Sequence, residues 1–512
     1  MRGGSRGLAP PDPRATWPAG SDRGALALVL HSHMPYVEGF GTWPFGEEWL
    51  WEAVATVYLP LAELLQRSGA PVTLGLTPVL CDQLETLPGP AGQRLLEFLA
   101  GTRRAVHAED AAGLDRGGEH ELADELRRAS GDYERAVLRL EHDLDVLGAL
   151  AAPAARGPVE LWTSAATHAL LPLLASDAGL RLQLATGVAS HERRFGEFAG
   201  GLWLPECAYV PGLERELAAH GVRTVCVDQT AAWGLGAPEQ LEPVRMPGGV
   251  VAVPIDWQTV RLVWDDRSGY PVDGAYRDYH RRTVHDLRPW SNAGGPYRPA
   301  VARARARAHA RDFVARCATR LESYARDRGR PGLLCCALDT ELLGHWWYEG
   351  QIWLEAVIEA AGEQGLELTT VSEGVERVGA VQRPLVASSW GLDRDFSTWD
   401  SPRVAELAFA ARSAELRTVA AAHRARPGVA PGDRCGRAAL ERAARELLAI
   451  QSSDWAFQVT SELAGDYPQQ RVRAHAAAHD AALGALADSA PEAQPALRNL
   501  APDLDLASLT TP

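Results

Sequence analysis

The most informative absence in this chain of 512 residues is lysine, since all 51 of its basic residues are arginine. A chain without lysine cannot form a lysine Schiff base, which excludes the usual pyridoxal-phosphate site. It also lacks the lysine of a phosphate-binding P-loop and that of a protein kinase. The sequence therefore excludes several large classes of enzyme.

Other scarce features bear on location and partners. The net charge of −15 argues against a nucleic acid or an anionic membrane as a partner. No apolar run approaches the roughly 18 residues that a membrane-spanning helix needs, and the N-terminus lacks the apolar core of a secretory signal. The seven cysteines contain no CxxC pair, which predicts buried, reduced thiols in a cytoplasmic protein.

Tryptophan, in contrast, is abundant: 16 tryptophans outnumber the 11 tyrosines and the 9 phenylalanines. A flat indole with a polar edge suits the apolar face of a sugar ring, and simple core packing is the alternative explanation. The tryptophans in polar surroundings are Trp43, Trp49, Trp51, Trp346, Trp347, Trp390 and Trp399.

Seven short apolar runs alternate with helical patterns along the chain. They span residues 25–30, 71–80, 159–165, 201–204, 224–227, 250–255 and 333–338. Continuous apolar strands separated by helices predict a parallel sheet that is buried on both faces. An eighth, weaker candidate at 366–371 could close or flank this sheet.

Six of the seven runs end in Asp, Glu or His. The carboxyl ends of the strands carry the active site of a βα barrel, so the pattern predicts a catalytic α/β barrel. We expect the barrel at 25–380 with a helical insertion at about 82–157, followed by a C-terminal helical domain at 381–488. The Gly, Pro and Ala content predicts a disordered segment at 1–24 and a flexible tail at 489–512.

Two carboxylates stand at the ends of predicted strands. Glu206 follows the run that ends in Leu204-Pro205, and Asp339 follows six consecutive apolar residues. Such a pair suits a glycosidase, in which one carboxylate attacks the anomeric carbon and a buried acid protonates the leaving oxygen. Helix capping or pairing with arginine is the alternative, and Glu341 competes with Asp339 for the role of the acid.

A metal site is the rival hypothesis from another class. His31 and His33 form an HxH pattern after the first strand, and His168, Asp228 and Asp256 could complete a ligand set of the amidohydrolase type. Binuclear sites of that type often use a carbamylated lysine, which this chain cannot supply. A non-catalytic sugar-binding protein is a further alternative.

Five motifs together resemble glycoside hydrolase family 57, and most closely its branching enzymes. They are HSHMPY (31–36), ELWTSAATHALLPLL (160–174), WLPECAYVPG (203–212), LDTELLGHWWYEG (338–350) and QSSDW (451–455). The resemblance implies an incomplete (β/α)7 TIM-like barrel with a helical insertion and a C-terminal helical domain, which agrees with the seven predicted strands.

Matched motif by motif, the resemblance implies that Glu206 is the nucleophile and Asp339 the general acid/base. Glu341 is then a neighbour of the acid. The resemblance further implies sugar contacts from His31, His33, His168, His345, Trp264, Trp399, Asp454 and Trp455.

The implied activity is retaining 1,4-α-glucan branching without a cofactor or metal, and an α-amylase or a 4-α-glucanotransferase of the same family is the alternative. The expected partners are an α-1,4-glucan donor and acceptor, and the expected assembly is a monomer or a small homo-oligomer. Two segments depart from the family pattern. Residues 392–396 replace an expected glycine-rich stretch, and residues 229–244 lack the expected lid tyrosine, so we predict that Trp233 takes the lid role.

Overall fold

The computed structural model describes residues 23–42, 45–425, 434–488 and 497–511. Residues 1–22 of the segment expected to be disordered, together with Trp43, lie outside the described residues.

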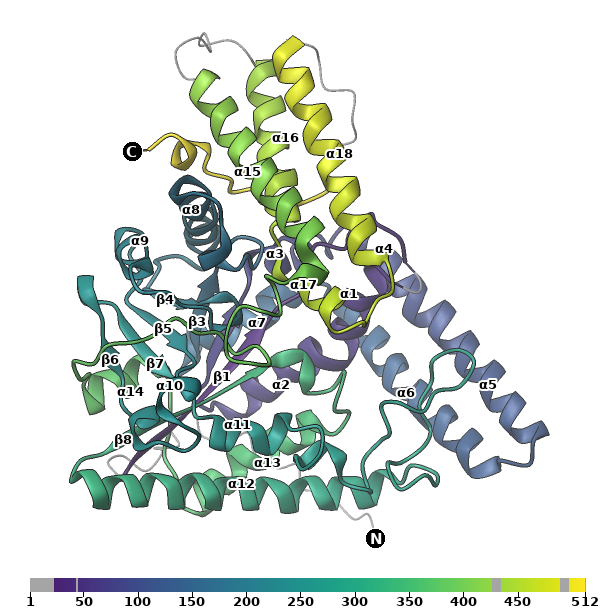
Figure 1. Ribbon diagram of the computed structural model, residues 1–512. Coiled ribbons are helices and arrows are strands. Elements are labelled where there is room, and N and C mark those ends of the chain that lie inside the picture. Colours follow the sequence, from purple (N-terminus) through teal and green to yellow (C-terminus); the bar gives the residue numbers. More distant parts are fainter. Residues whose placement is uncertain (1–22, 43–44, 426–433, 489–496, 512) are drawn as a thin grey trace.

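A curled sheet of nine strands forms the centre of the described structure (Figure 1). Along it the strands follow the order β6-β7-β5-β4-β3-β2-β1-β8, with β9 paired to β1, and only β6 runs antiparallel to its neighbour. The strands are β1 (Gly24–Ser32), β2 (Thr73–Leu76), β3 (Glu160–Ser164), β4 (Gly201–Trp203), β5 (Thr224–Val227), β6 (Val244–Arg245), β7 (Val251–Pro254), β8 (Gly332–Asp339) and β9 (Leu368–Thr369).

Seven parallel strands confirm the predicted incomplete (β/α)7 barrel. They are β1, β2, β3, β4, β5, β7 and β8, which correspond to the seven apolar runs of the sequence. The two ends of this parallel set meet at one isolated bridge between Ile255 and Cys335, where the Asp256 N–H also donates to the Cys335 carbonyl at 2.9 Å. The eighth candidate strand, β9, flanks β1, and the short β6 was not predicted.

The register between β1 and β8 positions the candidate site. Pairing runs from Gly24 beside Gly332 to His31 beside Asp339. At Gly24, where φ is 110°, a Cβ atom would lie 2.0 Å from the Gly332 carbonyl oxygen, so only glycine fits. Every residue of β1 is buried, which explains its continuous apolar sequence.

Helices cover the outside of this sheet. One long helix, α12, runs along one side of the barrel in Figure 1. The helices that precede or follow the barrel strands are α1 (Glu47–Ala53), α2 (Leu59–Ser68), α3 (Pro78–Leu84), α8 (Asp177–Phe195), α9 (Leu213–Ala219), α10 (Thr230–Trp233), α11 (Trp257–Trp264), α12 (Pro299–Arg328), α13 (Gly350–Glu363) and α14 (Val371–Val378).

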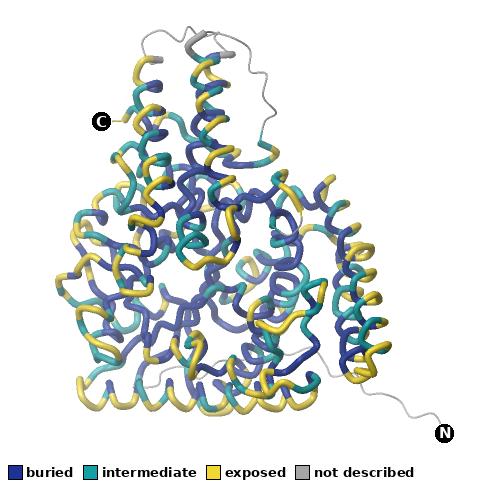
Figure 2. The backbone as a smooth tube through the Cα atoms, turned by 45° about the vertical axis from the view of Figure 1, so that its right-hand side comes forward, coloured by how far each residue is buried: buried dark blue, intermediate teal, exposed yellow. Residues whose placement is uncertain are grey.

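Between α3 and β3 the chain forms a further group of helices. They are α4 (Pro90–Glu97), the π-helical segment η2 (Phe98–Arg103), α5 (Arg104–Arg116), α6 (His120–His142) and α7 (Val146–Arg156). Helices α5 and α6 lie side by side and extend away from the barrel, and Figure 2 shows many exposed residues on this hairpin. The predicted insertion thus consists largely of helices, and one side of its long hairpin faces solvent.

Four helices follow the barrel: α15 (Ala405–Ala425), α16 (Arg434–Ile450), α17 (Ser453–Thr460) and α18 (Tyr467–Asp488). In Figure 1, α15, α16 and α18 project away from the sheet, whereas α17 lies at the end nearest to it. These helices share a hydrophobic cluster that includes Leu447, Leu448 and Trp455 and extends to Tyr36 and Val79 of the barrel. The cluster therefore joins the two parts of the chain.

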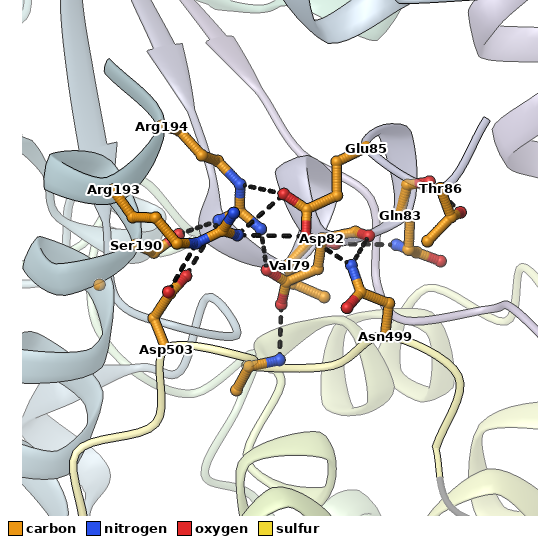
Figure 3. A network of polar contacts seen from close by, with 12 residues as sticks. Val79, Asp82, Gln83, Glu85, Thr86, Ser190, Arg193, Arg194, Asn499 and Asp503 are labelled. Carbon is orange, nitrogen blue, oxygen red and sulfur yellow. Dashed lines mark hydrogen bonds and ion pairs between the residues drawn. The ribbon is translucent and has the colours of Figure 1, made fainter. Parts of the chain in front are cut away.

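The expectation of a flexible tail does not hold for residues 497–511. Leu509 is fully buried, and the Ala501 N–H donates to the Asp82 carboxylate at 2.7 Å. Arg193 of α8 pairs with Asp503 at 2.6 Å, within the polar network of Figure 3. Composition alone missed this segment because a few apolar residues and one cluster of charged partners anchor it.

No helix within the described ranges is long and apolar enough to cross a membrane. Six of the cysteines are buried and form no disulfide, as expected, and the side chain of Cys435 lies outside the described residues.

Candidate active site

Glu206 lies three residues after the end of β4, in a backbone conformation that L-residues rarely adopt. Its φ is 60°, and the next residue, Cys207, also has a positive φ of 51°. Pro205 fixes the preceding turn. Backbone strain of this kind is concentrated at functional sites, where the surrounding structure holds it in place.

Two donors hold the Glu206 carboxylate. The Trp390 indole N–H donates to Oε2 at 2.7 Å, and the Ser453 hydroxyl lies 2.9 Å from Oε1. Burial raises the pKa of Glu206, and these two hydrogen bonds oppose that change because they favour the charged form. Glu206 is therefore a partly buried carboxylate whose anionic form has specific support.

Asp339 is the last residue of β8, and its surroundings differ. Among the described residues, none donates a hydrogen bond to its carboxylate. Burial, followed by the nearby carboxylates of Glu341, Glu206 and Asp454, raises the pKa of Asp339 well above its ordinary value. Such a group holds its proton to a higher pH than an ordinary aspartate does, which suits a proton donor.

Three histidines lie together beside the two carboxylates. His31 Nε2 lies 2.9 Å from His168 Nε2, and the rings of His33 and His168 stack with centroids 4.0 Å apart. The His31 ring also stacks on Trp203. His31 and His168 are only 1% and 2% exposed, and burial is the largest cause that lowers the pKa of both well below 6.5. Both rings are therefore neutral.

His33 differs because it pairs with Asp454 of α17. His33 Nε2 lies 2.7 Å from Asp454 Oδ2. Burial lowers the pKa of His33, but the charge and hydrogen bond of Asp454 outweigh it and raise the pKa overall. Burial likewise acts against ionisation of Asp454, yet His33 lowers its pKa to about 2. The result is a partly buried ion pair between the barrel and the C-terminal helices.

Glu341 turns away from the position of the acid. Its Oε1 accepts hydrogen bonds from the His33 backbone N–H at 3.0 Å and from the Tyr58 hydroxyl at 2.5 Å. Burial is the main reason that its pKa rises to about 7. Tyr58 ends the π-helical segment η1 (Val54–Tyr58), a type of distortion that is frequent at functional sites. No motif or spacing in the sequence singled out Tyr58.

The metal hypothesis finds only part of its ligand set here. Asp228 and Asp256 form ion pairs with Arg394 and Arg320, both at 3.1 Å, and neither belongs to the group of histidines. His33, His168 and Asp454 do place one ligand atom each within 4.8 Å of one another. That donor set suits zinc, but the three side chains already hydrogen-bond to other protein groups.

Sequence comparison places these residues in a family. The profile described as Glycosyl hydrolase family 57 matches residues 136–386. A 1,4-alpha-glucan branching enzyme of Thermococcus kodakarensis is 33% identical over 499 residues, which cover 88% of this chain and 72% of that protein. The chain belongs to glycosyl hydrolase family 57. The profile described as 1,4-alpha-glucan branching enzyme, C-terminal, matches residues 411–505.

Other relatives agree with this family assignment. A probable 1,4-alpha-glucan branching enzyme of Mycobacterium tuberculosis is 34% identical over 504 residues, with 91% of this chain and 92% of that protein covered. The crystal structure of a family 57 branching enzyme from Pyrococcus horikoshii superposes with a TM-score of 0.83 at 31% identity, covering 91% of this chain and 90% of that one. An alpha-amylase of Thermotoga maritima, 24% identical with a TM-score of 0.78, shares the fold; 92% of this chain and 95% of that one are covered.

Two of the predicted family 57 sugar contacts lie apart from the three histidines. Trp264, at the end of α11, is 37% exposed, and its ring centroid lies 6.4 Å from that of the similarly exposed Trp346. Burial is the main cause that lowers the pKa of His345 to about 4, and the charged groups that act on it include Glu52 and Arg103. Trp264 and Trp346 present an open aromatic surface, whereas His345 lies toward the inserted helices.

Two predicted sugar contacts are buried. Trp455 is 1% exposed, and its indole N–H donates to the Ala449 carbonyl at 2.8 Å. Trp399 is 4% exposed and packs against Leu170, Ala208 and the partly buried Trp390. This burial favours a packing role, which tryptophan fills equally well, and the sugar contacts of both residues stay a prediction.

The structure places Trp233 away from the groups that hold Glu206. It ends α10, packs against the hydrophobic cluster of β4, β5 and β7, and lies under the Arg383 guanidinium, 5.3 Å from its ring centroid. This position favours a packing role over the predicted lid role. The sequence analysis also missed Ser453, although that residue belongs to the QSSDW motif whose Asp454 and Trp455 were singled out.

Proposed function

We propose that this chain is a retaining 1,4-α-glucan branching enzyme, which cleaves an α-1,4 linkage and transfers the released chain to a 6-hydroxyl. Relatives at 33% and 34% identity carry the name of this activity, in one case as probable, and so does the profile that matches residues 411–505. The observation that carries the mechanism is the contrast between Glu206, which has two hydrogen-bond donors, and Asp339, which has acidic neighbours instead.

In the first step, Glu206 attacks the anomeric carbon of the donor chain. The bond from this carbon to the glycosidic oxygen breaks, and the protonated Asp339 gives its proton to that oxygen. Trp390 and Ser453 fix the plane of the attacking carboxylate. The products are a glucosyl ester on Glu206 and a shortened chain with a free 4-hydroxyl.

In the second step, the Asp339 carboxylate accepts the proton of an acceptor 6-hydroxyl. The resulting oxygen attacks the same anomeric carbon and the bond to Glu206 breaks, which restores both carboxyl groups. Two inversions give net retention of configuration. We further propose that His33 and the neutral imidazoles beside it support the sugar through hydrogen bonds, without a cofactor or a metal.

Hydrolysis or α-1,4 transfer shares the first step and differs only in the acceptor. Incubation with amylose distinguishes them, because branching produces α-1,6 linkages with few new reducing ends. We expect α-1,6 linkages by NMR or by debranching analysis, and none with the Glu206→Gln variant. Reducing ends without α-1,6 linkages would replace the proposal with an amylase, and altered chain lengths alone would indicate a 4-α-glucanotransferase.

We also propose a cytoplasmic location and a glycogen-like glucan as the substrate. Six buried cysteines without disulfides support a reducing compartment. Growth of a deletion strain and measurement of its stored glucan would test the substrate. Light scattering would test the expected monomer or small homo-oligomer.

A further inference from the structure

Ser453 joins the C-terminal helices to Glu206. It begins α17 and is buried, and its backbone N–H donates to the His168 carbonyl at 3.2 Å. Its neighbour Ser452 forms an isolated antiparallel bridge with Ala169. These backbone contacts place the Ser453 hydroxyl between two groups, 2.9 Å from His168 Nδ1 and 2.9 Å from Glu206 Oε1.

His31, His168, Ser453 and Glu206 are linked in this order by hydrogen bonds, and the protonation of His31 determines which group donates in each of them. The Nδ1 of His31 is buried and has no hydrogen-bond partner among the described residues, whereas its Nε2 lies 2.9 Å from His168 Nε2. A neutral imidazole carries one N–H, and a buried N–H without an acceptor is rarer and costlier than an unpaired acceptor. The proton of His31 therefore stands on Nε2 and points at His168.

His168 must then accept on Nε2, so its own proton stands on Nδ1. From there it donates to the Ser453 oxygen. Because this donor occupies one side of the hydroxyl, the proton of Ser453 is directed toward Glu206 Oε1. His168 has a φ of 57°, so its backbone, like that of Glu206, is held in a strained conformation.

We infer that Ser453 is a positioning residue: the two buried histidines, His31 and His168, direct its hydroxyl proton at the Glu206 carboxylate. The inference rests on the proposed function, in which Glu206 is the nucleophile. A carboxylate that receives two directed hydrogen bonds remains ionised and presents a fixed oxygen to the sugar. The C-terminal helices thus act on the reaction through one hydroxyl.

Rapid trapping of the nucleophile tests this role. A 5-fluoro-glucosyl fluoride forms a stable ester with the nucleophile, and its good leaving group needs no protonation. We expect mass spectrometry to find the label on Glu206. In Ser453→Ala the rate of labelling at pH 5 should fall by about 10-fold to 100-fold, as expected for loss of a hydrogen bond to a charged group. The loss should be smaller at pH 8, because the pKa of Glu206 rises when a donor is removed.

Two further variants complete the experiment. Ser453→Thr retains a hydroxyl and should recover part of the rate, whereas Ser461→Ala, on the exposed end of the same helix, should label like the unmodified protein. Label on another residue would overturn the proposed function. Label on Glu206 with an unchanged pH dependence in Ser453→Ala would overturn the positioning role alone.

Nitrogen NMR of the histidines tests the inference without activity, including the case in which Ser453→Ala fails to fold. With ¹⁵N-labelled histidine, we expect His31 as the Nε2–H tautomer and His168 as the Nδ1–H tautomer. The ¹⁵N signals that disappear in His31→Gln belong to His31, and those that disappear in His168→Gln belong to His168. A charged His168, or its Nε2–H tautomer, would contradict the directed chain.

Discussion

A partly buried carboxyl group follows β4 and another ends β8, but the surroundings of the two groups differ. Glu206 after β4 receives hydrogen bonds from Trp390 and Ser453. Asp339 at the end of β8 receives none among the described residues, and the carboxylates of Glu341, Glu206 and Asp454 add to the effect of burial on its pKa. Burial raises the pKa of both groups, but hydrogen bonds oppose this rise at Glu206 and not at Asp339. The donors around a carboxyl group, more than its burial, separate the two roles.

The strongest test removes each carboxyl group in turn. Glu206→Gln should lower branching activity on amylose by about 10⁴-fold or more, because no covalent ester can form. Asp339→Asn should lower it by roughly 10²-fold to 10⁴-fold, since protonation of the leaving oxygen is lost. A glucosyl fluoride should restore ester formation in Asp339→Asn but not in Glu206→Gln. If a glucosyl fluoride restored ester formation equally in both variants, Glu206 and Asp339 would not have the different roles that we propose.

At the β4 end, Trp390→Phe removes one donor while it keeps most of the ring. The pKa of Glu206 should then rise, so the acidic limb of the pH–rate profile should move up by about 1 pH unit. Trp399→Phe is the matched control, because the buried Trp399 indole N–H has no partner in the structure. The same shift of the acidic limb in both variants would show that the loss of packing, and not the loss of the hydrogen bond, causes the shift.

At the β8 end, Glu341→Gln removes the carboxylate that raises the pKa of Asp339. In the proposed mechanism Asp339 must be protonated, so activity should be lost as the pH rises through its pKa. The variant should therefore lose activity at a lower pH, by about half a pH unit to one unit. Glu349→Gln is the control, since this buried acid interacts with Tyr297 and Arg277 instead. An alkaline limb that does not move would assign the high pKa of Asp339 to burial alone.

The smallest expected effect is that of metal removal. A cation held by His33, His168 and Asp454 would add positive charge near both carboxyl groups and would weaken the contrast between them. Exhaustive treatment with EDTA should leave the branching rate unchanged, with no stoichiometric metal by elemental analysis. Activity that is lost to the chelator and restored by one metal would make the histidines ligands.

The sequence by itself determined the barrel. Seven apolar runs predicted the seven parallel strands, because strands buried on both faces need continuous apolar residues. Glu206 and Asp339 were predicted as the catalytic pair because Asp339 follows such a run directly and Glu206 follows one after Pro205. The two-residue β6 and the packed segment at 497–511 escaped detection, since so few residues carry no clear periodicity.

Only the tertiary structure decided how the site is completed. The two donors to Glu206 lie 184 and 247 residues further along the chain, and no local pattern relates them to it. The same QSSDW motif contains Ser453, which faces Glu206, and Trp455, which is buried in the C-terminal cluster. The spacing of residues in the sequence determines which of them are neighbours on one helix or strand. The packing of the C-terminal helices against the barrel determines which of these residues contact the candidate site.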